Sequence, residues 1–157
     1  MKTQNRLPSL LCFVFLFISI SLFSQKDDVV DIILTVDVSQ LGDNPNAPGG
    51  CTFMAEPNAV VLENLTAKDF TIGVENGKKL KWKGRTTDGD VVKILKIHYL
   101  SGTNIFNKSN LRRCLFGRKV RNRVRQTTID KPDYIYGIKF KVKKKGKYYL
   151  DPKIRVK

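Results

Sequence analysis

The chain has 157 residues and a formal net charge of +15, with 29 Lys and Arg against 14 Asp and Glu. This length fits one ordinary domain that buries a real hydrophobic core. Because the sequence holds a single histidine and no Cys-x-x-Cys pair, it excludes a zinc site of the usual kind.

Residues 1–24 predict a cleaved secretory signal peptide, because Lys2 and Arg6 precede the apolar run Leu10–Phe23. That run is shorter than the roughly 20 apolar residues that a membrane span needs, so we expect no transmembrane anchor. The mature domain is then residues 25–157, and the expected location is secreted or periplasmic in a bacterium. Export argues against intracellular nucleic acid as a partner.

The mature chain is predicted to be a series of short strands, because β-branched and aromatic runs alternate with Gly, Pro, Asn and Asp. Asn76-Gly77 lies between two of these runs and predicts a hairpin. No stretch has helical periodicity, so the fold class is all-β, a single antiparallel β-sandwich or a partly closed barrel. The predicted strands are 29–38, 52–56, 59–63, 70–75, 79–86, 91–100, 111–116, 119–127, 134–143, 148–150 and 153–156.

The positive charge is concentrated in the last third of the chain. Residues 25–107 hold nine Lys and Arg against eleven Asp and Glu, whereas residues 108–157 hold eighteen against three. In two basic runs, 118–125 and 139–147, cationic residues alternate with mostly apolar ones, which predicts half-buried strands with a cationic solvent face. The candidate binding residues are Arg118, Lys119, Arg121, Arg123, Arg125, Lys139, Lys141, Lys143, Lys144 and Lys145.

Cationic strand faces attract polyanions by Coulomb steering and counterion release. The alternative is a solvated face whose lysines guard a sheet edge. The leading hypothesis is a secreted, non-catalytic sandwich that binds an anionic polymer or a glycan surface through its basic last third. Five aromatic residues either form a sugar-stacking platform or belong to the core: Trp82, Tyr134, Tyr136, Tyr148 and Tyr149. We expect Trp82 in the core.

Cys51 and Cys114 are the cysteines of the mature chain. In an oxidising compartment they can pair, and a bridge closing a loop of this length adds about 4 kcal/mol on the chain-entropy model. The alternative is two separately buried thiols, since both cysteines have strand-like flanks. The pairing is therefore a hypothesis with an open alternative.

The sequence offers weak candidates for metal binding and for catalysis. Asp43, Asn46, Asp88 and Asp90 lie in two predicted loops, where oxygen side chains can bind Ca²⁺, although the same residues also serve ordinary turns. No other cofactor is predicted. Nucleophilic catalysis needs a base and an orienting group around Ser or Cys, and His98 alone, in an aliphatic strand, gives it little support. We therefore expect a protein that is not an enzyme.

Several short landmarks occur in a characteristic order. They are the aliphatic strand VDIILTVDV at 30–38, the turn Asn44–Pro48, Trp82-x-Gly84, Tyr99–Thr103 followed by Phe106, and the terminal Asp151–Val156. In this order they resemble the small AidA/PixA inclusion-body protein family of bacteria. The resemblance implies a β-sandwich-like fold, no catalytic residue, and a non-enzymatic protein that is exported or accumulated. It also supplies the alternative function, a structural protein that self-assembles through its sheet edges.

Overall fold

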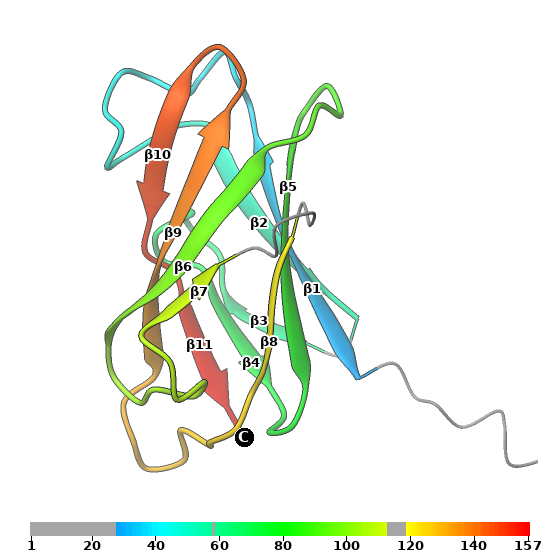
Figure 1. Ribbon diagram of the computed structural model, residues 1–157, viewed down its shortest axis with the longest axis vertical. Helices are drawn as coiled ribbons and strands as arrows, with labels where there is room; N and C mark the ends of the chain where they lie inside the picture. Colours follow the sequence, from blue (N-terminus) through cyan, green and yellow to red (C-terminus); the bar gives the residue numbers. More distant parts are fainter. Residues whose placement is uncertain (1–27, 58, 113–118) are drawn as a thin grey trace, which may run out of the picture.

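The computed structural model describes residues 28–57, 59–112 and 119–157. Within these ranges the chain forms strands and turns without a helix, which confirms the all-β fold class (Figure 1). The predicted signal peptide, residues 1–24, lies outside the described residues. The strands are β1 (Val29–Val36), β2 (Cys51–Glu56), β3 (Val60–Glu63), β4 (Thr71–Val74), β5 (Lys79–Thr86), β6 (Lys93–Ser101), β7 (Asn110–Arg112), β8 (Val120–Arg123), β9 (Tyr134–Val142), β10 (Gly146–Leu150) and β11 (Lys153–Val156).

The strands form two sheets, which face each other as a sandwich. The small sheet has the order β2-β1-β5-β8, and the large sheet has the order β3-β4-β11-β9-β6-β7, with β10 also paired to β9. Figure 1 shows β10, β9 and β6 on the left and β1 and β5 on the right. The sheets are mixed rather than purely antiparallel, because β1 pairs with β5 and β4 pairs with β11 in parallel.

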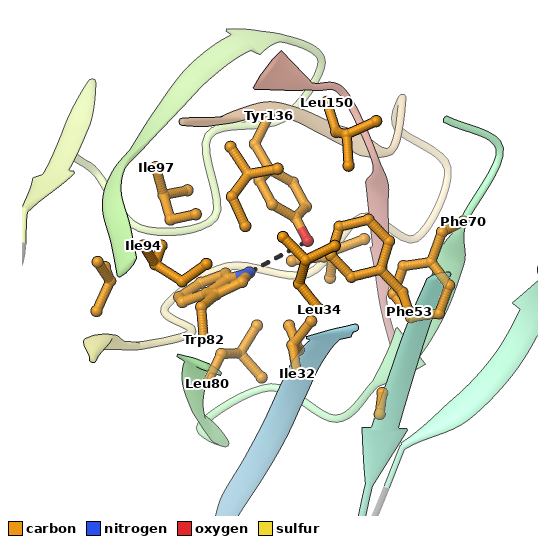
Figure 2. Close-up of a cluster of buried hydrophobic side chains, with 14 of the residues drawn as sticks. Ile32, Leu34, Phe53, Phe70, Leu80, Trp82, Ile94, Ile97, Tyr136 and Leu150 are labelled. Atoms are coloured by element: carbon orange, nitrogen blue, oxygen red, sulfur yellow. Dashed lines mark hydrogen bonds between the residues drawn. The ribbon is translucent and has the colours of Figure 1, made fainter. Parts of the chain in front are cut away.

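The core lies between the sheets and follows from residue alternation along the strands. In β1, Val30, Ile32 and Leu34 are 0% exposed, while the residues between them are partly exposed. This period of two is that of a strand with one face buried. Figure 2 shows Ile32 and Leu34 of the small sheet pointing toward Tyr136 and Ile97 of the large sheet.

Trp82 lies at the centre of this core, as expected, and it joins the two sheets. Its indole Nε1 donates a hydrogen bond to the hydroxyl of Tyr136 over 3.2 Å (Figure 2). The Trp82 ring also meets the rings of Phe106 and Tyr136 edge-on. Trp82, Tyr134 and Tyr136 are 0% exposed and Tyr148 is 6% exposed, so these four rings cannot form a sugar-stacking platform. Tyr149, the fifth ring of that hypothesis, is partly exposed.

The Asn76-Gly77 turn does not make the predicted hairpin. It links β4 in the large sheet to β5 in the small sheet, so the two strands belong to different layers. Gly77 has φ of +83°, which suits the tight turn. The hairpin prediction was wrong because β4 and β5 do not pair with each other. Each strand satisfies its backbone in a separate sheet, β5 beside β1 and β4 beside β11.

Candidate functional site

A dense group of cations covers the outer face of the large sheet where β7, β6, β9 and β10 lie next to one another. We call this surface the β6–β9 face. It is built by alternation, because Phe140 and Val142 point into the core and turn Lys139 and Lys141 outward. Its cations are Lys93 and Lys96 of β6, Arg112 of β7, Lys139 and Lys141 of β9, and Lys147 of β10.

Cations lie directly opposite one another across the strands of the β6–β9 face. Lys96 faces both Lys139 and Arg112, and Lys141 faces both Lys93 and Lys147. Like charges in directly opposed positions destabilise a sheet. No Asp or Glu occurs in the strands that carry these cations, so the face has no acid of its own to offset the repulsion.

Two rings lie among these cations. The Tyr149 ring, in β10, is 4.8 Å from the ammonium nitrogen of Lys139. His98 lies opposite Gly137, and a Cβ built on that glycine would come within 2.0 Å of the imidazole Cε1. The imidazole therefore lies across the backbone at Gly137, in space that only glycine leaves open. Both rings are partly exposed.

The surroundings of His98 favour the neutral form of its imidazole over the charged form. Partial burial lowers the pKa of His98, and the nearby charges of Lys96 and Lys139 lower it further. A nucleophile arrangement would need Ser or Cys hydrogen-bonded to this ring and an acid to orient it. Among the described residues, no hydrogen bond of that kind involves His98.

A second cationic surface covers the outer side of the small sheet, and we call it the β5–β8 face. Lys79 and Lys81 of β5 lie opposite Arg123 and Arg121 of β8. Here an acid is present, because the Asp31 carboxylate of β1 pairs with Lys83 and, over 3.1 Å, with Lys81. Burial of Asp31, which would raise its pKa, is outweighed by these two lysines, so its pKa lies below the usual value. The cations of this face are Lys79, Lys81, Lys83, Arg85, Arg121 and Arg123.

The predicted binding residues are therefore divided between two opposite surfaces. Lys139 and Lys141 belong to the β6–β9 face, and Arg121 and Arg123 belong to the β5–β8 face. Lys143, Lys144 and Lys145 form the exposed turn after β9 rather than extending the strand. Lys119 and Arg125 are exposed on either side of β8, and Arg118 lies outside the described residues.

The sequence reasoning missed the cations of β5 and β6. They lie in the half of the chain whose net charge is slightly negative, so a count along the sequence hides them. The alternation that predicts a cationic strand face was nevertheless present in β5. There, Lys79, Lys81 and Lys83 alternate with Leu80 and Trp82. Strand pairing then places the cations of β5 and those of β6 beside basic residues that are distant in the sequence.

The four residues considered for Ca²⁺ do not line one common hollow. Asp88 and Asp90 line a hollow of about 240 Å³ together with Lys143 and Lys144, whose ammonium groups compete with a metal cation. Asn46 forms an ordinary turn, in which its backbone N–H donates to Asn44 over 3.0 Å. In the part of the chain that the structure describes, no three His, Cys, Asp or Glu side chains gather in a way that could hold a metal ion. The Ca²⁺ hypothesis stays a prediction.

Another hollow, of about 600 Å³, lies between the loop that precedes β9 and the end of β11. Its best-defined polar group is the pair of Arg155 and Asp133, joined by two hydrogen bonds of 3.0 and 2.9 Å. Because this pair satisfies both side chains, the hollow offers no free acid–base pair at that position.

Cys51 is buried at the start of β2, and burial raises the pKa of its thiol to about 11. A thiol in this state is a core group rather than a nucleophile at neutral pH. Cys114 lies outside the described residues, so the pairing of Cys51 with Cys114 stays a prediction.

One sheet edge differs from the cationic faces. Strand β3 is the edge of the large sheet, and all four of its residues are exposed. Val60 is 57% exposed, Val61 44% and Leu62 41%, and Leu65 just beyond the strand is 86% exposed. Met54, on the edge strand β2 of the small sheet, is 47% exposed. We call this surface, made of Met54, Val60, Val61, Leu62 and Leu65, the β3 edge.

No family model matches the chain, and no curated protein matches it. Among solved structures, the chain is similar to an inclusion body protein, PixA, from Burkholderia cenocepacia, with a TM-score of 0.62 and 10% sequence identity. The match covers 86% of this chain and 98% of that protein. The resemblance to the AidA/PixA family is thereby confirmed at the level of the fold.

This comparison corrects the predicted location. A secreted or periplasmic protein was expected from residues 1–24, but the neighbour is an inclusion body protein, which contradicts that location. An oxidising compartment therefore no longer supports the pairing of Cys51 with Cys114. Among the described residues there is no helix long and apolar enough to cross a membrane.

Proposed function

We propose that this chain is a non-catalytic structural protein that self-assembles through the β3 edge. The observation that carries the proposal is the exposure of Val60, Val61 and Leu62 on an edge strand. An edge strand presents unpaired backbone N–H and C=O groups, and an apolar edge without lysine or proline is a template for pairing with another chain. Strand β3 has neither residue.

The charge distribution also favours contact at this edge. A net charge of +15 makes copies of the chain repel one another over most of their surface. Glu56 at the end of β2 and Glu63 at the end of β3 lie beside the β3 edge, and neither forms a salt bridge with another described residue. These acids therefore reduce the repulsion between copies at this edge.

The structural neighbour supports the same function. It shares the sandwich fold and is an inclusion body protein. A non-catalytic role is supported by His98, whose imidazole lies across Gly137 between two lysines rather than beside a nucleophile. The charge of the β6–β9 face concerns polyanion binding and not self-assembly through the β3 edge.

The proposal is tested by light scattering over a range of protein concentrations, comparing the original chain with Val61→Lys. We expect the mean mass of the original chain to rise with concentration and that of Val61→Lys to stay near the monomer. The added lysine introduces charge at the edge and would have to be desolvated on pairing.

Leu100→Lys is the matched control, because Leu100 is 46% exposed against 44% for Val61 and gains the same charge. It lies in β6, away from the β3 edge, and should assemble as the original chain does. A chain that stays monomeric at all concentrations, or equal loss of assembly in the two variants, would refute the proposal.

A further inference from the structure

The cations of the β6–β9 face form two rows that run across the strands. Lys96 lies between Arg112 and Lys139 in one row across the strands, and Lys141 lies between Lys93 and Lys147 in the next row. Neighbouring strands are about 4.8 Å apart, and successive outward residues of one strand are about 6.6 Å apart. A flexible polyanion can therefore meet several cations at once along either direction.

This face differs from the β5–β8 face because none of its cations pairs with an acid within the described molecule. Lys81 and Lys83 of the β5–β8 face share Asp31, and Arg155 pairs with Asp133. None of the six cations of the β6–β9 face forms a salt bridge with a described residue. The fold thus keeps opposed like charges together at a cost in stability that a bound polyanion would remove.

The aromatic side chains of the β6–β9 face indicate which class of polyanion fits it. The Lys139 ammonium lies over the Tyr149 ring in the first row, and His98 lies on the other side of Lys139 along the neighbouring strand. Rings placed among cations on an open sheet are the arrangement by which proteins bind single-stranded nucleic acid, with cations on the phosphates and rings under the bases. In a duplex the base faces are stacked on one another, so they are not available to stack on such rings.

We propose that the β6–β9 face binds single-stranded nucleic acid, with its lysines on the phosphates and Tyr149 under a base. Predicted export was the reason for setting nucleic acid aside, and the structural neighbour contradicts the exported location. This binding does not depend on self-assembly, because the β3 edge and the β6–β9 face use different residues at different strands.

The first test measures binding of a short fluorescent oligothymidylate to the full chain by anisotropy. Contact with about five phosphates predicts a slope near −3.5 in the logarithmic salt plot, which is about a hundredfold loss of affinity between 50 and 200 mM salt. Affinity that does not change over this range, or no binding at low salt, overturns the proposal.

The second test separates this face from the net charge of the molecule. Lys139→Gln with Lys141→Gln should weaken oligothymidylate binding by about tenfold or more, because two central phosphate contacts are lost. The matched control is Arg121→Gln with Arg123→Gln, which removes the same charge from the β5–β8 face and should change the affinity less than about threefold. Equal losses in both double variants would show that binding follows net charge alone.

The third test asks whether bases are recognised. Tyr149→Leu should weaken oligothymidylate binding about tenfold, and Tyr149→Phe, which keeps the ring, should bind as the original chain does. Inorganic polyphosphate, which has no bases, should bind the original chain and Tyr149→Leu equally well. If Tyr149→Leu leaves oligothymidylate binding unchanged, or weakens polyphosphate binding as much, the face binds polyanions without reading bases and the single-strand proposal is wrong. Retained melting temperatures show that the variants are folded.

Discussion

The hydrogen bond between Trp82 and Tyr136 joins side chains of the two sheets inside the core. Both side chains are 0% exposed, so the indole N–H has no water to replace a lost partner. A buried donor left without a partner costs about 1–3 kcal/mol. This contact therefore joins the two sheets and adds stability.

Tyr136→Phe should lower the free energy of unfolding by about 1–3 kcal/mol, because the ring stays packed while the Trp82 donor loses its acceptor. Urea unfolding measures the change. Tyr149→Phe removes the same atom from a partly exposed ring and should change stability by less than about 0.5 kcal/mol. Equal effects in the two variants would show that the buried hydrogen bond adds nothing.

His98 should make stability depend on pH. Its pKa in the folded state is lowered by partial burial and by Lys96 and Lys139, whereas the unfolded value is about 6.5. The unfolded state then binds more protons near that pH, so the stability contribution is complete above about pH 6.5 and is lost as the pH falls through the folded pKa. Urea unfolding between pH 5 and 8 should show this rise, and His98→Gln should flatten it. Since the sequence has no other histidine, an unchanged slope would contradict the assignment.

At the scale of the element, β9 shows how one strand serves both the core and the surface. Phe140 is 0% exposed and stacks on Tyr148 of β10, while Lys139 and Lys141 point outward. The alternation thus determines which substitutions the strand tolerates.

Lys139→Glu with Lys141→Glu should leave the free energy of unfolding unchanged or slightly higher, because these substitutions replace like-charge pairs with opposite ones at Lys96 and Lys93. Phe140→Ala should cost about 3–5 kcal/mol, since it removes a fully buried ring. Thermal or urea unfolding compares the two variants. A double Glu variant that unfolds while Phe140→Ala is tolerated would mean that the strand is turned over.

At the scale of the whole molecule, the same charge has opposite effects on the two proposed interactions. Copies carrying +15 repel one another, and salt screens that repulsion. Binding of a polyanion instead gains from counterion release and weakens in salt.

Raising the salt from 50 to 200 mM should therefore increase the mean mass in light scattering while it lowers affinity for oligothymidylate. The same protein preparation serves both measurements. If both processes weaken in salt, assembly depends on ionic contacts between copies and not on the apolar β3 edge.

The sequence by itself determined the all-β class, because strands with one buried face show the period of two in residues such as Val30 to Val36 and Tyr134 to Val142. It also favoured the core for Trp82 and predicted that Lys139 and Lys141 share one exposed face. These features depend on side-chain alternation along a single strand, which the sequence records directly.

The tertiary structure alone decided which strands become neighbours. It placed β6 beside β9, which joins Lys93 and Lys96 to lysines more than forty positions away, and it separated Arg121 from Lys141 onto opposite sheets. It also made β3 an edge and sent β4 and β5 to different sheets across the Asn76-Gly77 turn. Strand pairing depends on how all the buried faces are covered at once, so local sequence could not specify it.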